Sequence, residues 1–437
     1  MSTLRWLPGA DDDADGPRPR SDDDAHRRLH ADEGYDPSGI EGRPRLPVAF
    51  ALRGCAATLR AAGPGLRSVD VEHRAAALDR IGRSWRDPLD EHRREALDRL
   101  PAELDATPSS VAWALDRTFA SWTRERFLSW WSRSPPGGRG VELSAHVWAG
   151  NVFTSGLPPV AASLLAGVPA LIKAPGHLPT FAALFARSVV HHAFELGPCV
   201  GAAAWPRTDE RATRSLLAAD VAFAFGDAGS LDALAALGSA PLHRFGPRYS
   251  IAWAEESLAG GEEGLAHDVL AYDGQGCLTP KWLFVRSGLD SAVGVAKKLA
   301  GALERVATGV LPAPPLEAGP GAARAAWLAS TAFDGWSVGG PGWAVAATPW
   351  APDLSPPPRC LHVVPVASAA ELASRLSPLG ATLQGCALLD VDAASSELLD
   401  ALSPLGVSRV VPAGELQRPP VDWIHDDVDP ISILRTR

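Results

Sequence analysis

One cysteine lies in a glycine-rich segment whose composition suits covalent catalysis. Residues 273–280 read DGQGCLTP, which places Cys277 directly after Gly276. Glycines permit tight backbone turns and let a ligand approach the chain closely. A thiolate there could attack a carbonyl carbon, and the Cys277 backbone N–H could stabilise the oxyanion that forms. The chain continues into another element from Leu278, and a helix N-terminus near the thiol would lower its pKa.

The other four cysteines lack this context, and we predict that they are buried structural residues: Cys55, Cys199, Cys360 and Cys386. A structural role is the competing interpretation for Cys277 as well, but its glycine neighbours favour function. Five widely spaced cysteines without a CxxC pair indicate reduced thiols rather than disulfides or a zinc site. No metal site is therefore predicted.

A second candidate is an asparagine upstream of the cysteine. Residues 146–151 read HVWAGN and are predicted to end a strand at Asn151. A side-chain amide at that place could donate a second hydrogen bond to an oxyanion. On spacing alone, an asparagine that forms a turn is the simpler interpretation.

Three further residues follow predicted strands, where the ligands of parallel sheets bind. Lys173 ends one strand and could contact a ribose or a phosphate, although an exposed lysine at a strand end explains it equally well. Gly226 and Ser230 belong to the sequence FGDAGS at 225–230. Backbone N–H groups and a helix N-terminus there could lie beside a pyrophosphate. A plain strand–turn–helix junction is the alternative.

The elements that must position these residues alternate in type. Strand-like segments are predicted at 145–151, 169–173, 200–205, 221–225 and 249–253. Helix-like segments are predicted between them, at 158–166, 179–195, 208–218 and 229–237. Such alternation indicates βαβ units that build a parallel sheet. The chain has no GxGxxG sequence, so an ordinary Rossmann dehydrogenase is disfavoured.

A helical region precedes this block, and a second α/β block follows it. Apolar spacing predicts helices from residue 48 to about 134, with the aromatic residues of 122–131 interpreted as core or as a partner surface. The second block has predicted strands at 281–286, 361–366, 386–391 and 407–412, and predicted helices at 290–307, 368–377 and 393–402. The Pro/Gly/Ala-rich residues 308–358 are predicted to form a surface excursion or a loop near a substrate.

The composition is that of a globular protein with an acidic segment at one end. The chain has 437 residues, of which 46% are hydrophobic, and a net charge of −10, which argues against nucleic acid as the main partner. Residues 1–46 are rich in Asp, Arg, Pro and Gly and are predicted to be disordered. No segment offers the roughly 20 apolar residues of a membrane span, and no secretory signal is evident. A cytoplasmic protein is expected.

Taken together, these segments resemble the aldehyde dehydrogenase superfamily, and most closely its acyl-CoA reductase branch, the LuxC-type long-chain fatty acyl-CoA reductases of bacterial bioluminescence. In that superfamily an asparagine after the first strand and a Gly-Gln-x-Cys loop frame the catalytic centre, and Asn151 and Cys277 match them. Segments typical of the LuxC branch are matched by HVWAGNV at 146–152, FGPRYS at 245–250, CLTP at 277–280, RVVPAG at 409–414 and HD at 425–426. The resemblance spans residues 47–437.

Two positions depart from the pattern of the branch, and one absence is informative. Phe153 stands where a proline is usual, and Asp427 stands where a glycine is usual. Aldehyde-oxidising members carry a Glu-Leu-Gly-Gly motif whose glutamate activates water, whereas the corresponding residues 244–247 read RFGP here. Glu255 and Glu256 come later and are interpreted as solvated. Without a base, hydrolysis of an acyl-enzyme should be slow, which favours thioester reduction over aldehyde oxidation.

The resemblance implies an α/β fold of the aldehyde-dehydrogenase type, with two parallel-sheet domains and an N-terminal helical segment. It places the helices and the cofactor-binding domain in residues 47–247. The catalytic domain with the cysteine loop would occupy 248–412, and 413–437 would form a tail that returns to the cofactor domain.

The implied activity is reduction of a fatty acyl-CoA or acyl-carrier thioester to an aldehyde with NADPH, with NADH as the alternative. The acyl group would be carried by Cys277, with Asn151 as an oxyanion donor. Lys173 would contact the cofactor ribose, and Gly226 with Ser230 would contact the pyrophosphate. A homo-oligomer is the expected assembly. Two alternatives stay open: an NAD(P)-dependent aldehyde dehydrogenase that runs oxidatively, and a catalytically degenerate scaffold subunit of a reductase complex.

Overall fold

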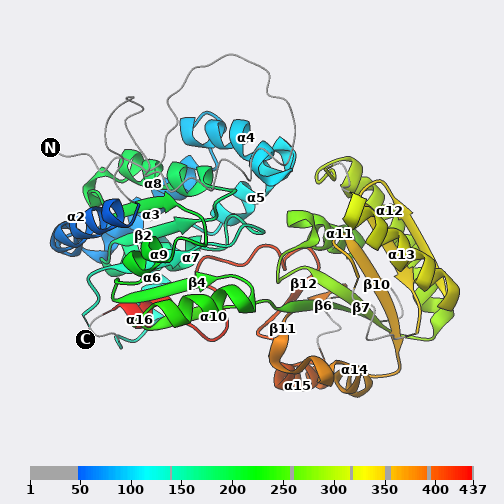
Figure 1. Cartoon of the computed structure of the whole chain (residues 1–437). Coiled ribbons are helices and arrows are strands. Elements are labelled where there is room, and N and C mark those ends of the chain that lie inside the picture. The colour runs from blue at the N-terminus through cyan, green and yellow to red at the C-terminus, as the bar shows by residue number, and fades with distance from the viewer. Residues whose placement is uncertain are drawn as a thin grey trace, which may run out of the picture. The chain divides into compact units, whose positions relative to one another are not determined.

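The computed structural model describes residues 48–137, 140–255, 260–314, 318–349, 356–390 and 395–435 (Figure 1). The predicted disordered segment 1–46 lies outside these residues. The chain divides into two compact units. Unit 1 takes its described residues from Met1–Ala96, Ser121–Gly246 and Val428–Arg437, and unit 2 takes them from Leu97–Ala120 and Pro247–Asp427. No helix in the described ranges is both long enough and apolar enough to cross a membrane.

Five helices form the region that was predicted to be helical: α2 (Val48–Ser68), α3 (Val71–Ser84), α4 (Glu91–Leu104), α5 (Pro108–Phe119) and α6 (Arg124–Arg133). Side-chain caps begin three of them, because Asp70, Thr107 and Thr123 accept hydrogen bonds from backbone N–H groups of the first turns of α3, α5 and α6. Three of the four aromatic residues of 122–131 are core residues, since Trp122, Phe127 and Trp130 are at most 1% exposed, whereas Trp131 is partly exposed.

Unit 1 contains a five-stranded parallel sheet with the strand order β3-β2-β1-β4-β5. Its strands are β1 (Ser144–Val147), β2 (Ala170–Ala174), β3 (Val200–Ala204), β4 (Val221–Phe225) and β5 (Leu242–Phe245). The helices between them are α7 (Leu157–Ala166), α8 (Thr180–His192), α9 (Glu210–Leu216) and α10 (Ala228–Leu237). The prediction of alternating strands and helices is confirmed, but β5 was missed.

The strand order of unit 1 is that of a doubly wound nucleotide-binding sheet, although the sequence lacks the GxGxxG fingerprint. The order reverses between β1 and β4, and ligands of such sheets bind beyond the carboxyl ends of the strands at this point. Topology therefore directs attention to the loops that follow β1, β2 and β4.

Unit 2 contains a seven-stranded sheet with the order β12-β11-β6-β7-β10-β9-β8. Its strands are β6 (Tyr249–Ala254), β7 (Pro280–Arg286), β8 (Trp336–Gly340), β9 (Trp343–Ala347), β10 (Cys360–Val366), β11 (Leu383–Leu388) and β12 (Arg409–Pro412). Six strands run parallel, and β8 pairs with β9 in antiparallel fashion. The expectation of a second parallel-sheet domain is confirmed, with the antiparallel edge strand β8 making the sheet mixed.

Helices complete unit 2 around this sheet: α11 (Glu262–Leu270), α12 (Leu289–Thr308), α13 (Ala318–Asp334), α14 (Ala369–Leu376) and α15 (Ser396–Leu402). One core cluster joins alternate side chains of the central strands, such as Trp253 and Phe284, to Leu372 of α14 and Leu398 of α15. The fold is thus α/β, as predicted. Helices α14 and α15 pack on the sheet face that carries these alternate apolar side chains.

Three segments differ from their predicted form. Residues 308–358, expected to be a loop or a surface excursion, contain α13, β8 and β9. Residues Leu97–Ala120, expected beside the cofactor domain, belong to unit 2. In the predicted tail, residues 413–427 belong to unit 2, and only Val428–Arg437, with α16 (Pro430–Leu434), belongs to unit 1.

Candidate active site

Cys277 lies in a turn between the short 3₁₀ segment η2 (Ala271–Gly274) and strand β7. Three successive residues before it have left-handed backbone conformations, with φ of 50° at Tyr272, 52° at Asp273 and 67° at Gly274. Such conformations cost free energy at non-glycine residues and persist only where surrounding contacts enforce them. A Cβ atom at Gly274 would lie 2.3 Å from the backbone nitrogen of Arg359, so glycine is required there.

The buried guanidinium of Arg359 supplies much of this enforcement. It donates hydrogen bonds to the Asp273 carboxylate at 3.0 Å and to the carbonyl oxygens of Leu270, Leu311 and Gly342 at 3.1, 2.6 and 2.5 Å. Five N–H donors in a rigid plane suit a site with several acceptors. Arg359 therefore fixes the segment that leads to the cysteine.

Contacts on the other side of the turn hold the cysteine itself. The Ser250 hydroxyl, at the start of β6, donates to the Cys277 carbonyl at 2.8 Å, and the Lys281 ammonium donates to the Gly274 carbonyl at 2.8 Å. Thr279 is tied to Gln417, whose side-chain amide donates to the threonine hydroxyl at 3.0 Å. The backbone on both sides of Cys277 is thus fixed by side chains of unit 2.

Two charged groups, Arg248 and Asp426, act on the titration of the Cys277 thiol, which is partly exposed. Burial raises its pKa above the ordinary value, and the Asp426 carboxylate raises the pKa further. The backbone N–H of Arg248 donates to the sulfur and, together with the Arg248 guanidinium, opposes that rise. Arg248 Nε lies 3.3 Å from Asp426 Oδ1, and His425 Nε2 lies 3.8 Å from Asp426 Oδ2.

The expectation that a helix N-terminus lowers the pKa of this thiol was wrong. A strand follows the turn, so no helix dipole acts on the sulfur from that side. Because the pKa of Cys277 is raised, the thiol form is favoured in the free protein. A change in the charge of Arg248 or Asp426 would therefore change how readily the thiolate forms.

Substitutions of the two charged neighbours should move the titration of Cys277 in opposite directions. Asp426→Asn removes a negative charge and should lower the pKa, whereas Arg248→Gln removes a positive charge and should raise it. The measurement is the rate of Cys277 alkylation by iodoacetamide against pH, with the modified residue located by peptide mass spectrometry. Asparagine suits position 426 because it tolerates the φ of 53° there. Parallel shifts in both variants would contradict the assigned charges.

The other four cysteines have the surroundings of structural residues. Burial raises the pKa of Cys55 to about 11 and the pKa values of Cys199, Cys360 and Cys386 to about 12. None of the five cysteines, all of which lie in the described ranges, forms a disulfide.

Asn151 lies on an exposed loop of unit 1, four residues beyond the end of β1 rather than at the strand end. Buried aromatic side chains anchor this loop. Phe153 is buried and packs edge-on against Phe181, with ring centroids 4.8 Å apart. A Cβ at Gly156 would lie 2.0 Å from the Trp148 ring, so the loop has no room for a side chain there. Phe153, in place of the usual proline, thus anchors the loop that carries Asn151.

Lys173 is buried near the end of β2, which excludes the interpretation as an exposed lysine. Its ammonium donates to the Ala174 carbonyl at 3.3 Å and lies 5.3 Å from the centre of the Trp205 ring. Burial lowers its pKa. Within the described residues no carboxylate pairs with it, so this cation has donor capacity for an oxygen-rich ligand.

Gly226 and Ser230 follow β4 at the start of α10. The Asp227 carboxylate caps this helix, accepting hydrogen bonds from the Ser230 backbone N–H at 2.8 Å and from its hydroxyl at 3.1 Å. The junction interpretation therefore accounts for these contacts, since the helix N-terminus already holds a negative charge. The parallel register brings Val147 of β1 beside Lys173 of β2 and Ala224 of β4, so Asn151, Lys173, Gly226 and Ser230 all follow the same edge of the sheet.

Arg248, His425 and Asp426 were not predicted as site residues, although two of the sequence segments typical of the LuxC branch contain them. Both segments are separated from Cys277 in the sequence, Asp426 by more than a hundred residues. A local sequence pattern therefore could not show that they lie near the thiol. Only the sheet of unit 2 brings the start of β6 and the residues after β12 to the same turn.

Comparison with known proteins now decides the family. The sequence model for "Acyl-CoA reductase (LuxC)" matches residues 110–437, three quarters of the chain. The chain belongs to this family. The match includes the Cys277 turn, the Asn151 loop and the His425–Asp426 pair, and it establishes an oxidoreductase family of acyl and aldehyde chemistry. A search of curated proteins returns no match.

Solved structures show the same fold at low sequence identity. An NAD-dependent benzaldehyde dehydrogenase from Corynebacterium glutamicum is 14% identical, with a TM-score of 0.62 and 91% of each chain covered. An NAD-dependent aldehyde dehydrogenase from Sinorhizobium meliloti is 13% identical, with a TM-score of 0.63, covering 84% of this chain and 80% of its own. An NADP-dependent enzyme from E. coli is 14% identical, with a TM-score of 0.61, covering 87% and 86%. This LuxC-family chain therefore has the aldehyde-dehydrogenase fold.

Proposed function

We propose that the chain reduces a fatty acyl-CoA thioester to an aldehyde with NADPH, by way of an acyl group bound covalently to Cys277. The observation that carries the proposal is the Cys277 turn, where a partly exposed thiol is held by a strained backbone between Arg248 and Asp426. Holding a nucleophile in a fixed position can lower the activation free energy of the reaction substantially. The membership of the LuxC family supports the substrate class.

The first step is transfer of the acyl group from the thioester to the enzyme. The Cys277 sulfur forms a bond to the carbonyl carbon, and the bond from that carbon to the sulfur of CoA breaks. The proton of the Cys277 thiol ends on the CoA thiol, so no net charge is created. The Cys277 backbone N–H and the Asn151 amide are our candidates for the oxyanion donors, and loss of one such donor typically costs about 10²–10³ in rate.

The second step releases the aldehyde. When bound, the nicotinamide cofactor supplies the hydride that reduces the thioester carbonyl. The Cys277 sulfur then acts as the leaving group, its bond to the substrate carbon breaks, and the thiolate takes up a proton. Arg248 and Asp426 are the charged groups that set the cost of this thiolate.

Hydrolysis of the acyl group should compete poorly with reduction. Arg244, which by resemblance stands at the position of the water-activating glutamate of aldehyde-oxidising members, pairs with Asp232 at 2.5 Å. The later Glu255 accepts a bond from Trp253 and pairs with Arg286 Nε at 2.6 Å, so it serves as a structural ion pair. Glu256 lies outside the described residues. Residues 244–247 thus supply no carboxylate that could activate water, unlike the Glu-Leu-Gly-Gly motif of aldehyde-oxidising members.

Lys173 is our candidate for the cofactor ribose, since its buried ammonium has spare donors at the sheet edge where nucleotides bind. Lys173→Met should weaken NADPH binding by roughly 10- to 100-fold, the value of a hydrogen bond to a charged group. Folding should not suffer, because burial already disfavours the charge. The measurement is the NADPH Kd by fluorescence titration, with exposed Lys298→Met as control. An unchanged Kd in Lys173→Met would remove Lys173 from the cofactor site.

The proposal is tested by following the acyl group. Wild-type protein is incubated with acyl-CoAs of several chain lengths, and with acyl-carrier thioesters, and its intact mass is measured before and after addition of NADPH or NADH. We expect an acyl adduct that persists without cofactor and is discharged to aldehyde by NADPH, with one CoA released per acyl group. No adduct with any thioester would contradict the proposal.

The remaining candidates predict other products. An oxidative aldehyde dehydrogenase would turn an aldehyde and NADP⁺ into free acid without CoA. A scaffold subunit would catalyse neither this oxidation nor the reduction of a thioester.

The absence of disulfides among the five cysteines supports a reducing compartment such as the cytoplasm. The proposed assembly is a homo-oligomer, which sedimentation or light scattering would measure.

A further inference from the structure

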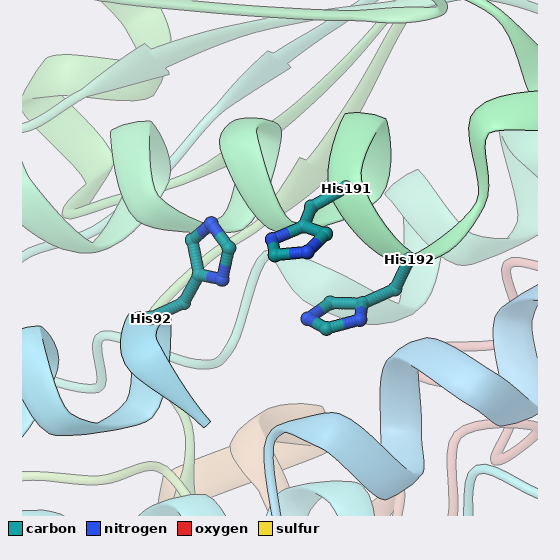
Figure 2. A group of neighbouring side chains, drawn as sticks. All are labelled: His92, His191 and His192. Atoms are coloured by element: carbon teal, nitrogen blue, oxygen red, sulfur yellow. The ribbon is translucent and has the colours of Figure 1, made fainter. Parts of the chain in front are cut away.

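Three histidines gather in unit 1 where the start of α4 meets the end of α8. Figure 2 shows His92 facing His191 and His192, which close α8. One ring nitrogen from each histidine lies within 4.8 Å of the other two. The rings of His191 and His192 stack nearly parallel with their centres 4.5 Å apart, and both lie edge-on to His92 at 5.4 and 5.6 Å.

One carboxylate lies beside one ring nitrogen of each member of the histidine pair, although His192 Nε2 makes no hydrogen bond of good geometry within the described residues. His191 Nδ1 lies 2.8 Å from the Glu91 carboxylate, and His192 Nε2 lies 2.7 Å from the Asp90 carboxylate. Histidines that bind metals characteristically present one nitrogen to the ion and donate the other to a carboxylate. Each of the two histidines therefore has its second ring nitrogen left for a ligand.

His92 supplies the third nitrogen from a buried position. It is 3% exposed, and its Nδ1 makes no hydrogen bond within the described residues. The nearest carboxylate oxygen, on Asp90, is 3.5 Å away, and the same oxygen accepts the His92 backbone N–H at 2.9 Å. A buried ring nitrogen without a partner costs free energy unless something binds it.

The charges around the cluster suit a cation. Two arginines near the cluster are already paired, Arg187 with Glu95 and Arg80 with Glu195. Within the part of the chain that the structure describes, the ion pairs of Asp90 and Glu91 are all with histidines of the cluster, so neither carboxylate is paired with an arginine or a lysine. His191 is more than half exposed, which gives an ion a path from solvent, while Asp90 and His92 close the inner side.

The geometry points to a site for a zinc-like divalent transition-metal ion, bound by His92, His191 and His192 and supported by Asp90 and Glu91. Imidazole nitrogens with carboxylate support favour Zn²⁺ and its neighbours over Mg²⁺ or Ca²⁺. Zinc–nitrogen bonds of about 2.0–2.1 Å place tetrahedral ligand atoms about 3.4 Å apart. The nitrogens, now within 4.8 Å of one another, therefore need to close by up to about 1.4 Å (4.8 minus about 3.4), which requires small rotations of the three side chains.

The ion would join two helices that lie far apart in sequence. α4 and α8 each contribute ligands at one end, so binding fixes the start of one helix to the end of the other. This inference does not depend on the proposed reduction, because none of its residues belongs to the Cys277 turn or to the loops that follow β1, β2 and β4.

The test uses the full chain without an affinity tag, stripped with a chelator and then titrated with Zn²⁺ or Co²⁺. We expect one ion per chain by elemental analysis, and Co²⁺ absorption bands of a tetrahedral nitrogen–oxygen site without thiolate charge-transfer bands, which excludes the cysteines as ligands. Zn²⁺ should also raise the melting temperature and slow hydrogen exchange at the first turn of α4 and the last turn of α8.

Variants assign the ligands. His92→Asn and the double change His191→Asn/His192→Asn should each lower Zn²⁺ affinity by at least 100-fold. His73→Asn is the matched control, because His73 lies in the same unit with its Nδ1 2.5 Å from Asp70, but belongs to no group of three metal-binding side chains in the described ranges. Absence of a stoichiometric ion in the folded wild type, or equal affinity in the cluster variants, would overturn the inference.

Discussion

Cys277→Ala is expected to abolish both acylation and aldehyde formation. Removal of a catalytic nucleophile costs roughly 10⁴–10⁶ in rate, because the remaining groups can orient the substrate but cannot form the covalent bond. The side chain is small and partly exposed, so its loss should not unfold unit 2. The measurement is the intact mass after incubation with acyl-CoA, together with aldehyde formed on addition of NADPH.

Cys55→Ala is the control for this prediction. Cys55 is also partly exposed, but burial raises its pKa to about 11 and it lies in unit 1. This variant should acquire the same adduct as the wild type at the same rate. An adduct that persists in Cys277→Ala would show that another residue carries the acyl group and would end the proposed mechanism.

Gly274→Ala is expected to have the second largest effect, on both stability and rate. The new Cβ would meet the Arg359 backbone nitrogen at 2.3 Å, at a residue with φ of 67°. Backbone strain of about 1–3 kcal/mol and overpacking of about 1–3 kcal/mol together predict a loss of roughly 2–6 kcal/mol in the free energy of unfolding of unit 2. Displacement of the nucleophile by about an ångström should slow acylation by roughly 100-fold.

Gly294→Ala is the matched control for this change. Gly294 lies within α12, and a Cβ there would meet nothing within 4 Å. Alanine should stabilise that helix by up to about 1 kcal/mol and leave acylation unchanged. Hydrogen exchange of peptides from η2 to β7 and from α12 reports the two local effects separately. Wild-type exchange and acylation in Gly274→Ala would show that the strained turn does not position Cys277.

Much of the fold follows from local patterns in the sequence. The predicted strand at 221–225 coincides with β4 because it is a short apolar segment between a polar turn and a helix cap. The predicted helices near Leu78 and Ile81 hold because their apolar spacing matches one face of a helix. Such signals lie within a few residues, so a single sequence contains them.

The elements that were missed have weak local signals. Helix α13 is rich in alanine and glycine and buries few side chains, among them Trp327 and Thr331, so it shows almost no apolar stripe. The short strand β5 has only one buried residue, Phe245. In both cases pairing and packing with neighbours decide the structure, and the sequence of the segment itself carries little of that information.

Functional sites are harder to predict than helices and strands, because their residues are distant in the sequence and meet only in the fold. The glycines around Cys277 predicted a special turn, but nothing in that segment indicates that Asp426 faces the thiol or that Arg359 holds the backbone. The same holds for His92, which meets His191 and His192 only because α4 packs near the end of α8. Neither cluster forms a sequence motif with fixed spacing.

The return of the last residues to unit 1 has a consequence for synthesis. In α16 and beside it, the Asp429 carboxylate accepts a hydrogen bond from Trp130 Nε1 at 3.1 Å, and the Arg435 guanidinium lies 4.0 Å from the centre of the Trp131 ring. Unit 1 therefore begins first on the ribosome and is completed last, after all of unit 2. At 5–20 residues per second, its sheet waits roughly 10–40 s for the segment that covers these tryptophans. Emergence of this segment is thus a folding event for unit 1, and a premature stop codon anywhere in unit 2 leaves the earlier unit incomplete as well.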